Sequence, residues 1–169
     1  MTATTPREQF LEAYEREHQT TLRVLRAYPK DKLDLRPHPT CKSARELAWM
    51  FVLERGLGTR VYHNAFATGG PPSGKPPAPP ESWDALLGAL AKAHQDVGKL
   101  VRSTPDAKLH EKVKFMTGPK TLGDWTRMGF LWFLLHHQIH HRGQFSVYLR
   151  MAGGRVPSIY GPSADEPWT

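Results

Sequence analysis

The stretch "LLHHQIHHRGQFSVYLRMAGG", residues 134–154, places four of the chain's nine histidines within six consecutive positions. It follows the apolar run "MGFLWFLL", residues 128–135, and its apolar residues continue at helical spacing as far as Tyr148. Two consecutive glycines then end the pattern. These features predict one long amphipathic helix from about Thr121 to about Ala152.

The histidines in this stretch form two pairs, each with the spacing that lets a helix bind one metal ion. Side chains four positions apart lie on the same face, one turn from each other. Either His136 with His140 or His137 with His141 could therefore bind one ion. Both faces continue into apolar residues, so the hydrophobic pattern does not choose between the pairs. A polar patch at the edge of a core would explain the same residues without a metal.

Three earlier segments also have the apolar spacing of helices, at about 6–28, 44–67 and 82–102. Ser43 and Glu46 have the spacing of a capping box at the start of the second of these segments. Ser82 is expected to cap the third. Local signals thus predict where two of the helices begin.

Before the last helix, Val113 and Phe115 alternate with lysines, which permits a short extended piece that Gly118 and Pro119 end. No convincing strand is found elsewhere. The sequence therefore predicts the all-α class and a four-helix bundle, with negligible sheet.

Two segments lack any regular pattern. The stretch "TGGPPSGKPPAPP", residues 68–80, is too rich in Pro and Gly to be helical and is expected to form a surface loop between the second and third helices. The C-terminal tail, residues 155–169, is irregular, yet its Ile159, Tyr160 and Trp168 indicate that it packs on the body. At 169 residues, the chain is expected to form a single domain, 1–169.

Composition narrows the kinds of site and partner. Cys41 is the single cysteine, so an intramolecular disulfide and a multi-cysteine metal site are excluded, and histidine and carboxylate remain as metal ligands. The net charge is +7, but acidic residues are interleaved with the basic ones in the first forty positions, so no nucleic-acid partner is expected. The N-terminus lacks a signal peptide and no apolar run is long enough to span a membrane, which predicts a cytoplasmic protein without a membrane partner.

The blocks "RPHPTCKSARELAW", "HHRGQ" and "IYGPSADE", taken in order along the chain, resemble the DinB-like (DinB/YfiT) family of bacterial four-helix bundle proteins. The usual metal site of that family has one histidine from the second helix and two from the last, spaced H-x-x-x-H. Aligned on "HHRGQ", the resemblance assigns the last-helix pair to His137 and His141. His136 and His140 are then expected to face solvent or to support the ligands.

The second helix departs from the family pattern, because Met50 stands where the resemblance places the third histidine. A thioether is a soft ligand and does not replace imidazole on zinc or nickel. Glu54, one turn further, could supply the third ligand, or could pair with Arg55 or an arginine of the first helix. His18, on the inward face of the first helix, is the other candidate for the third ligand.

The resemblance implies a divalent-metal-dependent enzyme, with zinc or nickel, of the thiol S-transferase or hydrolase type. A low-molecular-weight thiol or another small molecule would be its substrate, and a homodimer its assembly. The family name also implies a damage-inducible protein. The alternative is a non-catalytic small-molecule binding or stress-response bundle that has lost its metal activity. If only two imidazoles bind the metal, Met50→His should raise zinc or nickel affinity by orders of magnitude, whereas a third ligand from Glu54 or His18 predicts little change.

Overall fold

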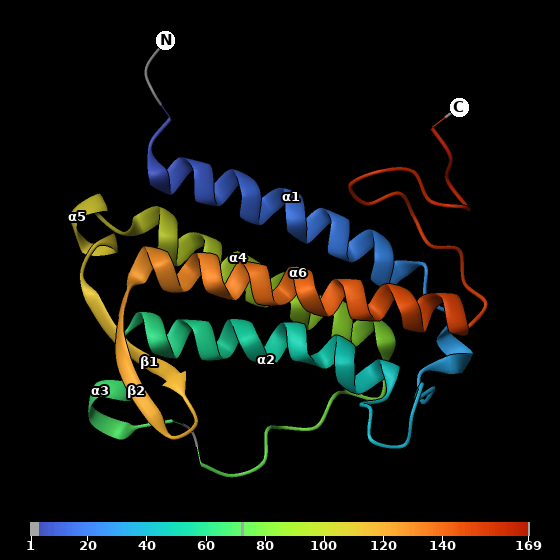
Figure 1. Ribbon diagram of the computed structural model, residues 1–169, viewed down its shortest axis with the longest axis horizontal. Coiled ribbons are helices and arrows are strands. Elements are labelled where there is room, and N and C mark those ends of the chain that lie inside the picture. Colours follow the sequence, from blue (N-terminus) through green and yellow to red (C-terminus); the bar gives the residue numbers. More distant parts are fainter. Residues whose placement is uncertain (1–3, 72, 169) are drawn as a thin grey trace.

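The computed structural model describes residues 4–71 and 73–168, and most of this part of the chain is helical (Figure 1). The four long helices are α1 (Pro6–Arg26), α2 (Ala44–Tyr62), α4 (Trp83–Ser103) and α6 (Arg127–Met151). The short elements are a 3-10 helix (Lys30–Lys32), α3 (Phe66–Gly69), α5 (Asp106–Leu109), β1 (Lys112–Gly118) and β2 (Thr121–Thr126). The described residues do not include residues 1–3, Pro72 or Thr169. These belong to the N-terminus, for which no signal peptide is expected, to the Pro/Gly-rich loop and to the tail.

The four long helices pack along their lengths, and helices that follow one another in sequence are not always neighbours. α1 packs against α4 and α6, and α2 packs against the same two helices, so α1 and α2 lie diagonally opposite each other (Figure 1). The largest buried apolar cluster takes side chains from all four helices, for example Leu25, Phe51, Leu90 and Phe145. This common core fixes which helix faces can meet.

The predicted helix starts are confirmed by their capping contacts. The Ser43 hydroxyl accepts a hydrogen bond from the Glu46 amide at 3.2 Å, and the Glu46 carboxylate accepts one from the Ser43 amide at 2.7 Å. The Ser82 hydroxyl accepts a hydrogen bond from the Ala85 amide at 3.2 Å. These caps are local, so the sequence is enough to predict them.

The predicted end of the second helix, near Ala67, is wrong, because α2 ends at Tyr62. Asn64 follows with a φ of 58°, a left-handed conformation that asparagine tolerates better than most residues. Its side-chain oxygen accepts a hydrogen bond from the Lys114 amide at 2.8 Å. α2 therefore ends just before Asn64, whose side chain binds strand β1.

The prediction of negligible sheet is also wrong, as is the start of the last helix near Thr121. β1 and β2 form an antiparallel hairpin in which Val113 lies opposite Trp125. Lys120, with a φ of 60°, occupies the turn between the strands. α6 begins only at Arg127, after Thr126, whose hydroxyl caps the helix.

The hairpin forms because its apolar side chains find partners on the helices. Val113 is buried in a cluster with Phe66 of α3 and Phe130 of α6. Phe115 contacts Phe130 edge to face, with ring centroids 4.9 Å apart. The helical spacing in the predicted segment 121–126 was too short to exclude a strand, and pairing with β1 decided it.

The tail is fastened to the helices by a buried ion pair. The Tyr160 hydroxyl donates to the Glu17 carboxylate at 2.7 Å and accepts from the Arg142 guanidinium at 2.6 Å. Arg142 itself donates to Glu17 at 2.7 Å, and both of these charged side chains are buried. Burial alone would raise the pKa of Glu17, but the bonds from Tyr160 and Arg142 outweigh it and lower the pKa. The tail thus completes a polar network between α1 and α6.

Tyr160→Phe should destabilise the protein moderately, since it removes the hydroxyl that joins the tail to Glu17 and Arg142. One net hydrogen bond of this kind contributes about 1 kcal/mol, which corresponds to about 2–4 °C in Tm for a chain of this length. Thermal unfolding followed by circular dichroism checks this. An unchanged Tm would mean that the tail does not contribute to stability through this hydroxyl.

None of the helices in the described residues has both the length and the apolar character to cross a membrane.

Candidate metal centre

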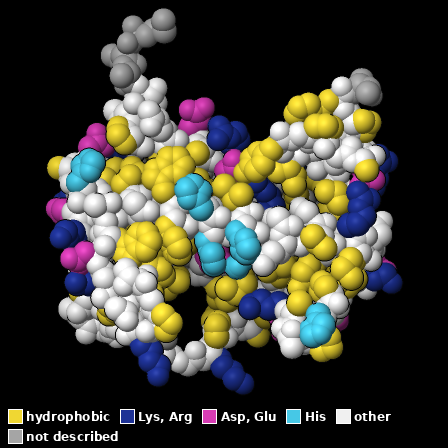
Figure 2. All heavy atoms as spheres, viewed as in Figure 1, with side chains coloured by type: hydrophobic (Ala, Val, Ile, Leu, Met, Phe, Trp, Pro, Cys, Tyr) yellow, Lys and Arg dark blue, Asp and Glu magenta, His cyan; other side chains and the backbone are white. Residues whose placement is uncertain are grey.

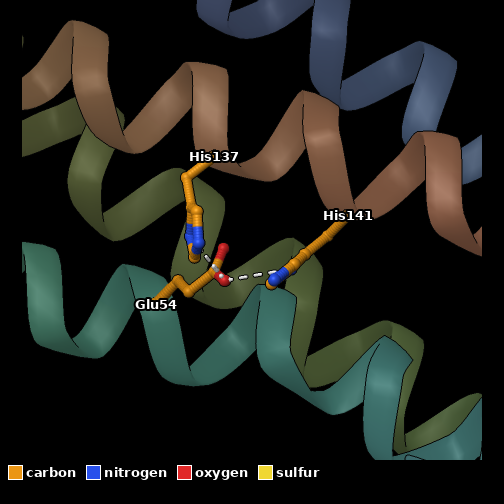
Figure 3. A group of neighbouring side chains, drawn as sticks. All are labelled: Glu54, His137 and His141. Atoms are coloured by element: carbon orange, nitrogen blue, oxygen red, sulfur yellow. Dashed lines mark ion pairs between the residues drawn. The ribbon is translucent and has the colours of Figure 1, made fainter. Parts of the chain in front are cut away.

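Glu54 on α2 and His137 and His141 on α6 point toward one another between the two helices (Figure 3). The same carboxylate oxygen, Oε1 of Glu54, lies 3.0 Å from Nδ1 of His137 and 3.4 Å from Nδ1 of His141. One potential ligand atom from each residue lies within 4.8 Å of the other two. The three side chains form a cluster of the size that one cation needs.

Helix packing brings this cluster together. His137 and His141 are one turn apart on α6 and share the face that packs against α2. One turn beyond Glu54, a Cβ at Gly58 would lie 2.5 Å from Cδ2 of Leu134. The glycine therefore allows α2 and α6 to approach closely beside the cluster.

Aromatic contacts orient the two imidazole rings. Phe133 stacks on His137, with centroids 5.9 Å apart and an interplanar angle of 13°. Trp125 of the hairpin packs on Phe133 at 5.1 Å. Phe51 meets the His141 ring edge to face at 6.4 Å. The hairpin missing from the sequence prediction thus supports His137 through one intermediate ring.

Glu54 is a buried carboxyl group that has no Arg or Lys partner in the part of the chain that the structure describes. It is 4% exposed, and in the described residues neither of its carboxylate oxygens has a hydrogen-bond partner. Arg55, the partner considered from sequence, instead donates to the Tyr14 hydroxyl and the Phe51 carbonyl. Burial raises the pKa of Glu54 to about 8, although the charge of Arg55 opposes this. A buried carboxylate in this state needs either a proton or a cation.

The two histidines are in the protonation state that metal binding requires. Burial, reinforced by the charges of His137 and His140, lowers the pKa of His141 to about 4. Burial also lowers the pKa of His137, with a smaller effect from His140. Both imidazoles are therefore predominantly neutral near pH 7 and available as ligands.

The separations within the cluster fit a divalent ion. Two ligand atoms that are each about 2.1 Å from one tetrahedral ion lie about 3.4 Å apart, and octahedral geometry brings them to about 3.0 Å. The carboxylate-to-imidazole distances of 3.0 and 3.4 Å fall at these values. Two imidazoles and one carboxylate are also a donor set that zinc and nickel accept. The residues present therefore fit the cation that the sequence led us to expect.

The other two histidines of this stretch, His136 and His140, are exposed and are not part of the cluster. The His140 ring nevertheless lies beside it, with centroids 5.7 Å from His141 and 6.4 Å from His137. Met50 is one turn from Glu54 and lines a neighbouring cavity. The two histidines of the cluster thus come from the face of α6 that packs against α2, and Glu54 comes from α2 itself.

His18, the other candidate for the third ligand, is buried as expected but lies outside the cluster. Its ring stacks on His94 of α4, with centroids 3.6 Å apart and an interplanar angle of 6°. The sequence places His18 on the inward face of the first helix but does not indicate which helix that face meets. Because α1 and α2 are diagonal, His18 instead meets α4.

The cluster is open to solvent on one side and adjoins two cavities. His137 is 43% exposed and His141 13%, and histidine side chains are visible at the surface beside a hollow (Figure 2). A cavity of about 350 Å³ reaches Glu54, and one of about 500 Å³ reaches His141. Small molecules can therefore approach the cluster from two directions.

The segment 73–77 of the Pro/Gly-rich loop forms one wall of the first cavity, a role that its composition did not suggest. The Trp49 indole donates a hydrogen bond to the Pro77 carbonyl at 2.8 Å and holds the loop near α2. The signal that could have indicated this contact is a tryptophan on a helix that is followed in sequence by a Pro-rich segment.

The sequence model of the DinB family matches residues 1–168 of this chain. The chain belongs to the DinB family. Among curated proteins, the DinB chain is similar to the uncharacterised protein YrdA of Bacillus subtilis, with 28% identity over 159 residues that cover 94% of this chain and 90% of YrdA. The resemblance noted from "HHRGQ" and "IYGPSADE" is thereby confirmed.

Two crystal structures of DinB-like proteins have the same fold as this DinB chain. One, from Bacillus cereus, has a TM-score of 0.71 and 24% sequence identity, and covers 90% of this chain and 97% of its own. The other, YjoA of Bacillus subtilis, has a TM-score of 0.66 and 17% identity, and covers 88% of this chain and 96% of its own. At these identities the likeness concerns the fold.

Proposed function

We propose that this DinB-family protein binds one divalent ion, zinc or nickel, through Glu54, His137 and His141, and is a metal-dependent enzyme of the thiol S-transferase or hydrolase type. The observation that carries the proposal is the buried Glu54 carboxyl, which has no Arg or Lys partner among the described residues and faces two neutral imidazoles. A divalent ion in this place acts as a Lewis acid and lowers the pKa of a thiol or water that it binds.

The surrounding residues prepare the site for that chemistry. Glu54 supplies one negative charge, so the three protein ligands leave a divalent ion with a net positive charge. Phe51 meets the His141 ring edge to face and Phe133 stacks on the His137 ring, so each imidazole has one apolar neighbour. The side of the cluster where His137 is exposed to solvent remains open for a reactant. This combination of three ligands and an open side is typical of catalytic rather than structural sites.

The two cavities favour transfer between two organic reactants over hydrolysis. The first reaches the cluster at Glu54 and has a mainly apolar wall. The second reaches it at His141 and includes Cys41, Lys42 and Gln144. A thiol and an electrophile could therefore approach from different sides, whereas hydrolysis needs space for only one organic molecule.

The activity can be tested with cysteine as the thiol and monochlorobimane as the electrophile. The zinc- or nickel-loaded, untagged protein should accelerate formation of the fluorescent thioether, and the His137→Ala/His141→Ala variant should not. Stoichiometric metal without any acceleration, for a panel of thiols and electrophiles, would favour the non-catalytic binding alternative instead.

Met50→His is expected to change zinc or nickel affinity by less than about tenfold. Glu54 already supplies a third ligand in this proposal, so a histidine at position 50 adds a fourth donor to a site that is preorganised without it. Competition titration with a chromophoric chelator measures the affinity. An increase of several orders of magnitude would instead indicate a site with only two imidazole ligands and no contribution from Glu54.

A further inference from the structure

The cavity that reaches Glu54 has an apolar body. It lies between α2 and the segment 73–77 and has a volume of about 350 Å³. Most of its lining is apolar, from Met50, Leu53, Leu57, Pro76 and Pro77. In Figure 2 a hollow with hydrophobic side chains on its flanks opens below the central histidines. A cavity of this size and lining suits a small organic molecule.

Two cations border this apolar cavity. Arg60 of α2 and Lys75 of the loop both contribute to the lining. Neither forms an ion pair with another side chain in the part of the chain that the structure describes. By contrast, Arg36, in the connection before α2, is paired with Glu46 at 2.9 Å. Arg60 and Lys75 are thus positive charges available to a ligand.

Arg60 is separated from the metal centre along α2. Arg60 is six residues beyond Glu54, which corresponds to about 9 Å along the helix axis. Leu57 lies between these two ends of the cavity, and Leu53 lies beside Glu54. A ligand that touches both ends therefore needs an apolar body about as long as an aromatic ring with a short chain.

We infer that this cavity binds a small organic acid, whose apolar body lies on Leu53 and Leu57 and whose anionic group pairs with Arg60 and Lys75. The other end of the molecule then lies at Glu54. The assignment of this acid as a substrate rests on the proposed function, whereas the preference of the cavity for acids does not require the metal. Charge complementarity disfavours amines, and the small volume excludes a nucleic-acid chain.

Isothermal titration calorimetry with three matched probes tests this inference. The probes are 4-phenylbutyrate, 4-phenylbutan-1-ol and 4-phenylbutylamine, which differ in charge but share one apolar body. The zinc-loaded protein should bind the acid at least about tenfold more tightly than the alcohol, and the amine most weakly. In the Arg60→Gln/Lys75→Gln variant, affinity for the acid should fall about three- to tenfold, with affinity for the alcohol unchanged.

Lys99→Gln is the matched control, since Lys99 is an exposed lysine on α4 away from this cavity. It should leave the binding of all three probes unchanged. Equal affinities for acid and alcohol in the wild type, or an acid preference that survives in the double variant, would overturn the inference.

The metal-free Glu54→Gln variant separates this inference from the proposed function. Retention of the acid preference in that variant supports recognition by Arg60 and Lys75, even if the wild type proves to bind no metal. The opposite result is loss of the acid preference in Glu54→Gln and its survival in Arg60→Gln/Lys75→Gln. It would show that the carboxylate of the probe binds the metal ion, and it would contradict the inference.

Discussion

The variant His137→Ala/His141→Ala is expected to retain no divalent metal, whereas the wild type retains about one ion per chain. In the proposed site the two imidazoles are two of three protein ligands, and Glu54 alone would not hold zinc or nickel against dialysis. Elemental analysis of the untagged proteins after dialysis measures this difference. The loss should be accompanied by loss of the stabilisation that the metal gives by mass action, seen as a lower Tm.

The matched control is His136→Ala/His140→Ala, which also replaces two histidines of α6, both at exposed positions. This variant should keep most of its metal. Equal losses in the two double variants would contradict the site, because they would indicate that the four histidines bind metal without the geometry seen between α2 and α6.

Glu54→Gln is expected to have two large and opposite effects. It should weaken zinc or nickel binding by about a hundredfold or more, because an uncharged amide replaces the single anionic ligand. It should also stabilise the metal-free protein near pH 7, since the folded state no longer contains an unpaired buried acid. The stabilisation is on the order of 2 kcal/mol, or about 6 °C in Tm.

The pH dependence follows from the raised pKa of Glu54. In the metal-free protein this pKa is about 8, against 4.5 for an ordinary glutamate, so between these values the folded state holds a proton that the unfolded state has lost. The stability that this proton provides is full below pH 4.5 and is lost progressively as the pH rises to about 8. Metal binding displaces the proton, so metal affinity should rise with pH up to about 8.

Thermal unfolding with EDTA at pH 5, 7 and 9 checks these expectations. The difference in Tm between Glu54→Gln and the wild type should grow from pH 5 to pH 9. Glu12→Gln, at an exposed position of α1, is the control and should follow the wild type. A Glu54→Gln protein that is less stable than the wild type at every pH would mean that the carboxylate has a stabilising partner in the absence of metal.

The parts of the fold that the sequence predicts are those set by local contacts. The capping boxes and hydroxyl caps at Ser43 and Ser82 need only neighbouring residues, and both helices begin where expected. The hairpin was missed because residues 121–126 are a short segment, whose conformation depends on pairing with β1 and on packing against Phe66 and Phe130. Such contacts are distant in sequence and leave little local signal.

In the candidate site, too, the sequence predicts what depends on local spacing but not what depends on helix packing. The spacing of His137 and His141 is local, but a second pair has the same spacing, and only the family resemblance distinguished them. Whether Glu54 or His18 lies beside them depends on which helices are neighbours. The diagonal placement of α1 and α2 is a property of the whole core, so sequence spacing left both residues open.

Elemental analysis of the wild-type protein, produced without a histidine tag and purified without chelators, tests the central claim most directly. We predict close to one zinc or nickel ion per chain, retained after dialysis into metal-free buffer. A content below about one tenth of an ion per chain, which does not recover when the protein is dialysed against zinc or nickel and then desalted, would contradict the account.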